Sequence, residues 1–233
     1  NIKKFSLFKK QERIFWVYQY LIGWMIKESA KRSEKIIVQT EWMKRQVEKI
    51  AGEGAVLKMS PNIPELELDN EEKWNQYKFI YPTSTVIYKN NEYLYKVSET
   101  LAKKGYNFTV EVTLEEEKKV KGIEFIGKIP RKRLLKKYEE CTLVFPSYIE
   151  TYGLPLAEAK LAGTLILAAD TEFSHEILSD YKNAYFYNPF DEKELFLLME
   201  RVITGDIKKE KISIEPITKN TWGDLIKILE NIG

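Results

Sequence analysis

Two glutamates in the segment FPSYIETYGLPLAEA, residues 145–159, have the type and spacing to bind a polar ligand. Glu150 and Glu158 are separated by seven residues, and a short apolar strand precedes the first of them. A helix is expected to begin near Pro155, since proline is well tolerated in a first helical turn. Its N-terminus would attract phosphate, and Gly153 would let a ligand approach the backbone. Glu158 could then accept hydrogen bonds from both hydroxyls of a ribose.

A parallel sheet is predicted to position these residues, because short apolar runs alternate with helical segments from about residue 78 onward. The expected strands are KFIYP (78–82), NFTVEVT (107–113), IEFIG (123–127), TLVFP (142–146), TLILAA (164–169) and AYFYNP (184–189). Helices are expected between them, and Asp191 with Glu194 is predicted to form a capping box. The fold class is therefore α/β, a Rossmann-like parallel sheet with helices on both faces. Such sheets bind ligands at the carboxyl ends of their strands.

The N-terminal part of the chain differs in character. Residues 1–35 carry nine Lys or Arg against three Glu, a net charge of +6, around the apolar stretch 14–26. That stretch is too short to cross a bilayer, which takes about 20 residues. We expect a helix buried on most sides, either in the core of a neighbouring domain or against an anionic membrane surface.

The whole chain is predicted to consist of three parts. A strand at 36–40 and a helix after it are expected to end a partial N-terminal domain spanning residues 1–60. Two prolines and a run of acids mark residues 61–75 as a linker. Residues 76–233 form the sheet domain. Because the chain begins at Asn1 and not at Met, we expect it to be a fragment.

Composition disfavours several classes of protein. Thirty-seven Lys and Arg against 35 Asp and Glu leave a net charge of +2, which argues against a general nucleic-acid binder. With one histidine, His175, a His-rich metal site is impossible and a zinc enzyme is disfavoured. The one cysteine, Cys141, allows no intrachain disulfide, which fits a cytoplasmic setting. It begins a predicted buried strand, so we expect an inert thiol.

The string Glu150-TYGLPLA-Glu158 resembles the hallmark of the family-4 retaining glycosyltransferases of the two-domain GT-B fold. The flanking Phe145-Pro146-Ser147 and the downstream GTLILAADTEFSHEIL and AYFYNPFD are similar to the family, as is FIGKIPRKRLLKKYEECTLVFPS. KIIVQTEWMKRQV resembles the last strand and helix of the family's N-terminal domain. The resemblance covers roughly residues 36–205, and it implies that residues 76–233 form the donor-binding domain.

The resemblance also implies roles for individual residues. Glu158 would bind the donor ribose, and Glu150 the transferred sugar. The family uses an Arg and a Lys five residues apart at the diphosphate; Lys89 matches the Lys, but Ser84 stands where the Arg would be. Arg131, Lys132 and Arg133 are candidates to compensate for that Arg. The implied catalytic residues are Glu150 and Lys89, and the implied donor-binding residues are Glu158, Thr151, Tyr152, Gly153, Leu154 and Ser84.

The function implied is retaining transfer of a sugar from a nucleoside diphosphate sugar to an acceptor hydroxyl, without a metal or other cofactor. The acceptor would be a saccharide or a lipid-linked saccharide, in the synthesis of a polysaccharide, a glycolipid or another glycoconjugate. A cytoplasmic location is expected, with peripheral contact at the inner face of the membrane. Two alternatives stay open: a non-catalytic nucleotide-sugar binding module and a sugar-nucleotide epimerase of similar architecture. Independently of these alternatives, Glu150 could be a solvated loop acid and Glu158 could be a surface position on the helix.

Overall fold

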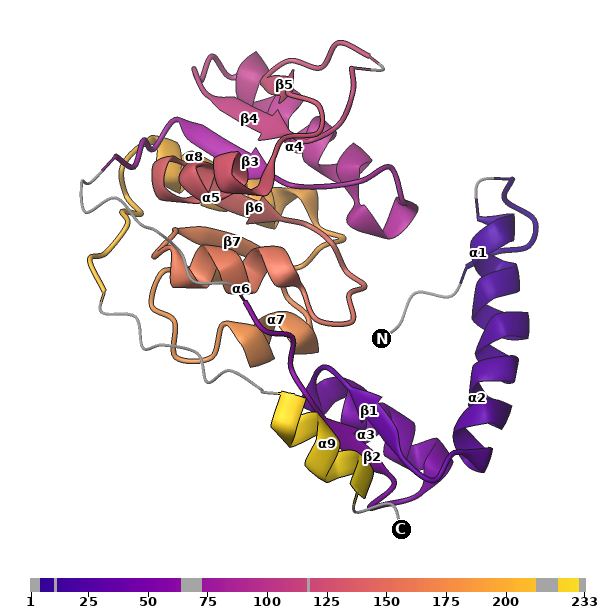
Figure 1. The fold of residues 1–233 in the computed structure, drawn as a ribbon. Helices are drawn as coiled ribbons and strands as arrows, with labels where there is room; N and C mark the ends of the chain where they lie inside the picture. The colour runs from indigo at the N-terminus through magenta and orange to yellow at the C-terminus, as the bar shows by residue number, and fades with distance from the viewer. Residues whose placement is uncertain (1–4, 11, 64–72, 117, 213–221, 231–233) are drawn as a thin grey trace. The chain divides into compact units, whose positions relative to one another are not determined.

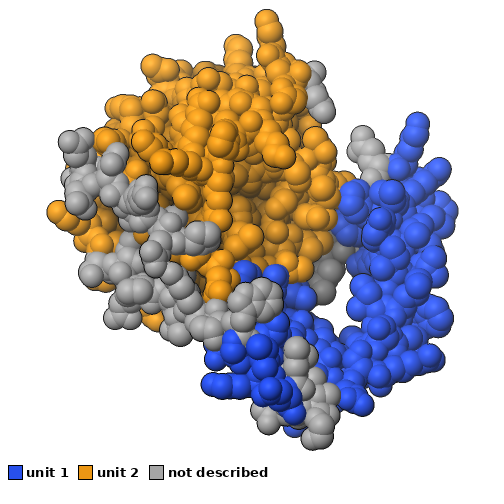
Figure 2. All heavy atoms as spheres, in the orientation of Figure 1, with its two compact units in different colours: residues 1–61, 220–233 blue, residues 62–219 orange. Residues whose placement is uncertain are grey.

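The computed structural model describes residues 5–10, 12–63, 73–116, 118–212 and 222–230. The chain divides into two compact units, residues 1–61 with 220–233 and residues 62–219 (Figure 2). Most of the predicted linker, residues 61–75, lies outside the described residues. The predicted sheet domain ran on to residue 233, whereas the last helix, α9 (Trp222–Glu230), is grouped with the first unit.

The second unit is built on a six-stranded sheet in which every pair of neighbours is parallel. The strand order is β5-β4-β3-β6-β7-β8. The strands are β3 (Lys78–Tyr81), β4 (Thr109–Val112), β5 (Ile123–Phe125), β6 (Thr142–Phe145), β7 (Ile166–Ala169) and β8 (Ala184–Tyr187). Each of them lies within a predicted strand, and the α/β fold class is confirmed. Every residue of β6 and of β7 is buried, as expected for the centre of a sheet covered on both faces.

Helices cover both faces of this sheet. The helical segments are η2 (Ile87–Lys89), α4 (Asn91–Lys103), α5 (Arg131–Glu140), α6 (Leu154–Leu161), α7 (Glu172–Ile177) and α8 (Glu192–Ile203). Figure 1 shows α4 and α8 on one face and α5, α6 and α7 on the other. Right-handed crossovers place α4 on one face and α5, α6 and α7 on the other, because the chain moves outward from β3 to β5 and then returns to continue from β6 to β8. Helix α8 follows the last strand and packs against α4.

The start of α8 departs from the predicted capping box. Asp191 caps the helix, but its carboxylate accepts from the Lys193 N–H at 2.9 Å instead of from the third helical residue. The Glu194 carboxylate accepts from the Asn188 N–H at 2.7 Å. The second acid therefore holds the loop that follows β8 and does not complete a reciprocal pair with Asp191.

Large aromatic side chains fill the core at the carboxyl half of the sheet. Tyr81 meets Phe145 edge to face, with ring centroids 5.8 Å apart. Tyr93 of α4 stacks on Tyr187 of β8 at 6.2 Å. Cys141 is buried, and burial raises the pKa of its thiol to about 12. The thiol is therefore protonated at neutral pH, in agreement with the expected inert cysteine.

The first unit contains a short parallel pair and a long helical segment. Strands β1 (Ile36–Val38) and β2 (Val56–Lys58) pair in parallel, and α3 (Glu41–Ala51) connects them. The Thr40 hydroxyl caps α3 by accepting from the Met43 N–H. Before them, α1 (Arg13–Val17), the π-turn η1 (Tyr18–Ile22) and α2 (Gly23–Arg32) follow one another without a break.

The apolar stretch 14–26 is not buried as expected. Ile14, Tyr18, Leu21 and Met25 are each more than half exposed, since no described part of the first unit covers them. No described helix is long and apolar enough to cross a membrane.

Candidate functional site

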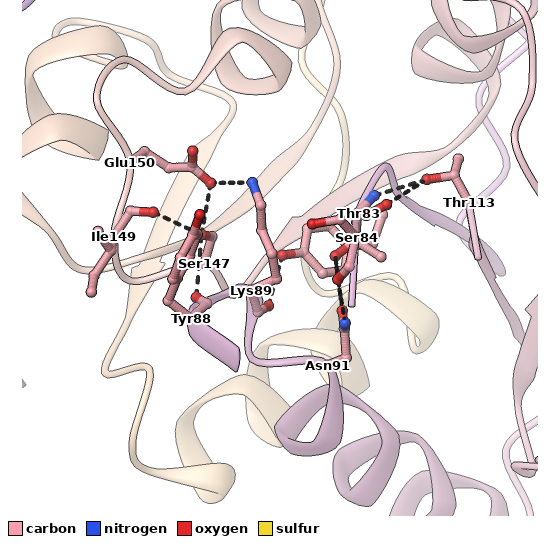
Figure 3. A network of polar contacts seen from close by, with 10 residues as sticks. Thr83, Ser84, Tyr88, Lys89, Asn91, Thr113, Ser147, Ile149 and Glu150 are labelled. Atoms are coloured by element: carbon pink, nitrogen blue, oxygen red, sulfur yellow. Dashed lines mark hydrogen bonds and ion pairs between the residues drawn. The ribbon is translucent and has the colours of Figure 1, made fainter. Parts of the chain in front are cut away.

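The candidate site lies at the carboxyl ends of the neighbouring strands β3 and β6. Because the two strands pair in parallel, the loops that follow them leave the same edge of the sheet. The Tyr148 N–H donates to the Tyr88 carbonyl at 3.1 Å, and the Ser147 hydroxyl oxygen lies 3.3 Å from the same carbonyl oxygen. These contacts bring Lys89 of η2 beside Glu150, as Figure 3 shows.

Lys89 and Glu150 form an ion pair within this network. The Lys89 Nζ lies 2.5 Å from Glu150 Oε1, and the Ser147 hydroxyl donates to the same oxygen at 2.7 Å. The two charged side chains are only 17% and 16% exposed. The Tyr81 hydroxyl donates to the Lys89 carbonyl at 2.7 Å, which holds the backbone of η2 against the sheet. Glu150 is therefore an ordered carboxylate at the strand edge and not a solvated loop acid.

The start of α6 has the backbone geometry on which the predicted anion binding rests. Gly153 precedes the helix with φ +95°, a conformation that strains any residue with a Cβ. Its carbonyl accepts from the Leu156 and Ala157 N–H groups. The N–H groups of Tyr152, Gly153 and Leu154 have no acceptor among the described residues, so they can bind a phosphate or a sugar oxygen.

Glu158 lies on α6 and is buried, with 8% of its side chain exposed. One carboxylate oxygen, Oε1, lies 2.5 Å from Arg131 Nη2 at the start of α5. Burial raises the pKa of Glu158 above its ordinary value, and the Arg131 guanidinium opposes that shift. A surface position on the helix is thereby excluded, because a surface glutamate would be neither buried nor paired in this way.

Ser84 borders a cavity of about 500 Å³ at the ends of β3 and β4. The Asn91 side-chain amide donates to the Ser84 carbonyl at 2.7 Å, and the Thr83 N–H donates to the Thr113 hydroxyl at 2.8 Å (Figure 3). The lining residues are Pro82, Thr83, Ser84, Thr85, Thr113, Leu114, Glu115, Lys128, Ile129 and Leu134. Hydroxyls, one acid and one lysine therefore face a space large enough for part of a nucleotide.

The structure separates the three cations that could replace the arginine missing at Ser84. Arg131 is engaged by Glu158, whereas Lys132 and Arg133 are exposed on the same helix. The lysine that lines the cavity with Ser84 is Lys128, which sequence reasoning missed. Its position directly after Gly127, in the loop that follows β5, could have indicated that Lys128 lies near the ligand site. Ser147 was also missed as a functional residue, although it stands in the FPS string beside Glu150.

Two further polar features bear on the chemistry. His175 Nε2 lies 2.6 Å from Asp170 Oδ1, and its ring stacks on Phe186, so the histidine has a packing role here. No group of three or more His, Cys, Asp or Glu side chains that could hold a metal occurs in the described part of the chain. Transfer without a metal stays a prediction.

Comparisons with known proteins agree with this fold. The family described as "Glycosyl transferases group 1" matches residues 64–216. Among solved GT-B structures, a variant of S. aureus TarM in complex with fondaparinux, alpha-GlcNAc-glycerol and UDP is 15% identical, with a TM-score of 0.65; the match covers 87% of this chain and 42% of that one. WaaG, a glycosyltransferase involved in lipopolysaccharide biosynthesis, is 17% identical with a TM-score of 0.57, over 73% of this chain and 54% of that one.

A third match is the pneumococcal O-GlcNAc transferase GtfA in complex with UDP and GlcNAc, at 14% identity and a TM-score of 0.59, over 80% of this chain and 40% of that one. The chain thus spans about half the length of these solved proteins or less. No curated protein matches it. Since the family match extends over most of the chain, including the whole sheet, this protein belongs to the glycosyl transferases group 1 family.

Proposed function

We propose that this chain is the donor-binding part of a retaining glycosyltransferase, which moves a sugar from a nucleoside diphosphate sugar to an acceptor hydroxyl. The observation that carries the proposal is the placing of Glu150, Lys89 and Glu158 around the start of α6. Two of the similar solved structures are complexes with UDP, and one of them also holds GlcNAc. The family match supports glycosyl transfer as the reaction class.

The geometry suggests how a donor would lie. The cavity beside Ser84 and Lys128 is suited to the nucleoside, because its hydroxyls and charges can be hydrogen-bonded by a base and a ribose. The buried Glu158 carboxylate would accept from the ribose hydroxyls. The diphosphate would lie over the backbone N–H groups of residues 152–154, and the sugar would lie near Glu150.

The chemical step needs stabilisation of the leaving nucleoside diphosphate. The Lys89 ammonium and the N-terminus of α6 supply positive charge at the place where negative charge develops. The transition state has oxocarbenium character by analogy with glycoside hydrolysis, and an ordered Glu150 carboxylate would orient the sugar through it. We do not assign Glu150 as a nucleophile. No metal is needed in this scheme.

A non-catalytic nucleotide-sugar binding module is the second candidate. It is favoured by Ser84, whose short hydroxyl supplies no charge where the family arginine would meet the diphosphate. Turnover with an acceptor separates the two functions, because a module binds the donor and leaves it intact. The epimerase alternative predicts a changed sugar without any acceptor.

The acceptor and the location belong to the same proposal. We propose a saccharide or lipid-linked acceptor in glycan synthesis, in the cytoplasm, with peripheral contact between the first unit and an anionic membrane. The support is the row of exposed apolar side chains at Ile14, Tyr18, Leu21 and Met25, in a segment with a net charge of +6. Burial of the same row against further protein is the competing arrangement.

Donor binding can be tested directly. UDP-, GDP- and ADP-sugars are screened by their effect on the melting temperature, and isothermal titration then measures the affinity of each hit. The proposal predicts stabilisation by at least one nucleotide sugar and by its free nucleoside diphosphate. For a donor that is turned over, proton NMR of the product should show the anomeric configuration of the donor. Absence of binding by all three classes would contradict the proposal.

A further inference from the structure

We propose that Arg131 is a positioning residue of the donor site, which holds and orients the Glu158 carboxylate for the ribose of the nucleotide. The inference rests on the proposed function, because it takes Glu158 as the group that meets the ribose. It adds a residue from a separate helix, α5, to the donor site on α6.

The contact between the two side chains is direct. Arg131 Nη2 lies 2.5 Å from Glu158 Oε1, although the residues are 27 positions apart in the chain. Arg131 is the first residue of α5, and Pro130 before it restricts the backbone at the start of the helix. The helices α5 and α6 lie on the same face of the sheet (Figure 1). The restricted backbone at the start of α5 therefore helps to position the Arg131 guanidinium beside Glu158.

Burial explains why Glu158 needs a partner. Its side chain is 8% exposed, whereas that of Arg131 is 46% exposed, so the arginine bridges a buried carboxylate to the surface. Burial favours the protonated form of a carboxyl group, and a nearby guanidinium favours the anion. The anion is an acceptor at both oxygens, whereas the protonated form carries an O–H donor on one of them, so the anion is better suited to two ribose hydroxyls. Arg131 holds Oε1 from one side, and the Tyr138 side chain interacts with the same carboxylate, whose remaining acceptor positions would meet the ligand.

The neighbouring cation on the same helical turn does not share this role. Arg133 is exposed, and no ion pair with a described residue involves it. Arg133 carries the same charge as Arg131 and lies two positions after it, at the same end of α5. Arg133→Gln is therefore a matched control that removes one positive charge near the site without touching Glu158.

The first experiment measures nucleotide affinity by isothermal titration between pH 6 and pH 8. The probe is whichever of UDP, GDP and ADP the wild-type chain binds most tightly, with its 2′,3′-dideoxy form as a second probe. Arg131→Gln is expected to weaken binding of the ribonucleotide about 10-fold or more at pH 7, the order expected for a lost charge-assisted contact. The loss should grow toward pH 6, because Glu158 then takes up a proton more readily.

Two comparisons make the result specific. Binding of the dideoxy probe should change little in Arg131→Gln, since that probe has no ribose hydroxyls for Glu158 to hold. Arg131→Lys should recover part of the affinity, because lysine restores the charge without the planar fork. A purely structural role of Arg131 would weaken both probes equally and would show no such dependence on pH.

A second readout needs no ligand. The carboxyl carbon of Glu158, followed by carbon-13 NMR, should titrate at a higher pH in Arg131→Gln than in the wild type, and Arg133→Gln should leave it in place. If Arg131→Gln and Arg133→Gln behave alike in both experiments while the wild type binds nucleotide, the inference is overturned and the proposed function stands. If the wild type binds none of the three nucleotides, both are overturned.

Discussion

Lys89 and Glu150 are 61 residues apart in the sequence, yet their charged groups lie 2.5 Å apart where β3 and β6 end. The family resemblance assigns Lys89 to the diphosphate and Glu150 to the sugar. On that assignment, one ion pair would span both parts of the proposed donor position. A bound diphosphate would compete with Glu150 for Lys89, and the Ser147 hydroxyl would keep Glu150 in place during the exchange.

The first prediction follows from this exchange. Lys89→Met should weaken binding of a nucleoside diphosphate by roughly 10- to 150-fold, the range expected for one lost charge-assisted contact, and should leave binding of the free nucleoside unchanged. Isothermal titration of both ligands measures the difference. Lys96→Met is the control, since Lys96 pairs with Glu192 on the exposed surface of α4 and α8. Equal losses for nucleoside and nucleoside diphosphate would remove Lys89 from the diphosphate.

Gly153 provides the second prediction. Gly153→Ala should lower the free energy of unfolding by more than about 1 kcal/mol, because φ is +95° and the new Cβ would lie 3.3 Å from Ile177 Cδ1. Gly105→Ala is a matched control, with φ +89° and open space around its Cβ. Urea denaturation should therefore show the larger loss at residue 153. Loss of nucleoside diphosphate binding should also be confined to Gly153→Ala.

The third prediction concerns pH and Glu158. Burial raises the pKa of this carboxyl group in the folded state. At pH values between the unfolded and the folded pKa, Glu158 therefore carries a proton in the folded chain but not in the unfolded chain. The stability that this proton contributes is present at low pH and is lost as pH rises through the raised pKa. Glu158→Gln cannot titrate. The free energy of unfolding of the wild type, relative to Glu158→Gln, should thus fall as pH rises from 4 to 7.

That dependence has a clear control. In an Arg131→Gln background the same fall should extend to higher pH, because Arg131 opposes the effect of burial on Glu158. Denaturant titrations of the four variants at several pH values provide the measurement. A difference between wild type and Glu158→Gln that rises with pH would show that Glu158 is stabilised as the anion.

The fourth prediction tests the proposed membrane contact. The complete protein should co-sediment with vesicles that contain anionic lipid, and less with neutral vesicles, because basic residues flank the exposed apolar row. Changing Lys3, Lys4, Lys9 and Lys10 to Glu should abolish the preference for anionic lipid. A matched variant changes Lys103, Lys118, Lys119 and Lys121 of the second unit to Glu, none of which lines the proposed donor cavity. Equal binding by the wild type and the first variant would favour burial of the apolar row against protein.

The sheet could be predicted from the sequence because each of its strands is a short apolar run between turn residues. TLVFP and TLILAA, for example, are wholly buried in β6 and β7, as continuous apolar runs in a parallel sheet should be. Glu150 and Glu158 could be singled out because one loop and the first turns of one helix carry both. Local sequence was sufficient for these features.

The partners of the two glutamates could not be predicted, since they come from distant segments. Nothing local to Arg131 or Lys89 indicates which acid each would meet, because that depends on which helices share a face and which strands are neighbours. Exposure of Met25 and Leu21 was missed for a related reason: an apolar stretch predicts burial, but it does not say what covers it. The Glu194 carboxylate likewise accepts from the Asn188 N–H in the preceding loop, and this contact depends on the position of β8.

The central claim is that Glu158 binds the nucleotide while Glu150 faces the sugar. It is tested most directly by isothermal titration of Glu158→Ala and Glu150→Ala with a nucleoside diphosphate, with melting curves to show that both variants fold. We predict a loss of about 10- to 150-fold for Glu158→Ala and unchanged binding for Glu150→Ala. Equal losses in both variants would contradict the division of roles, and unchanged binding in both would show that the donor lies elsewhere.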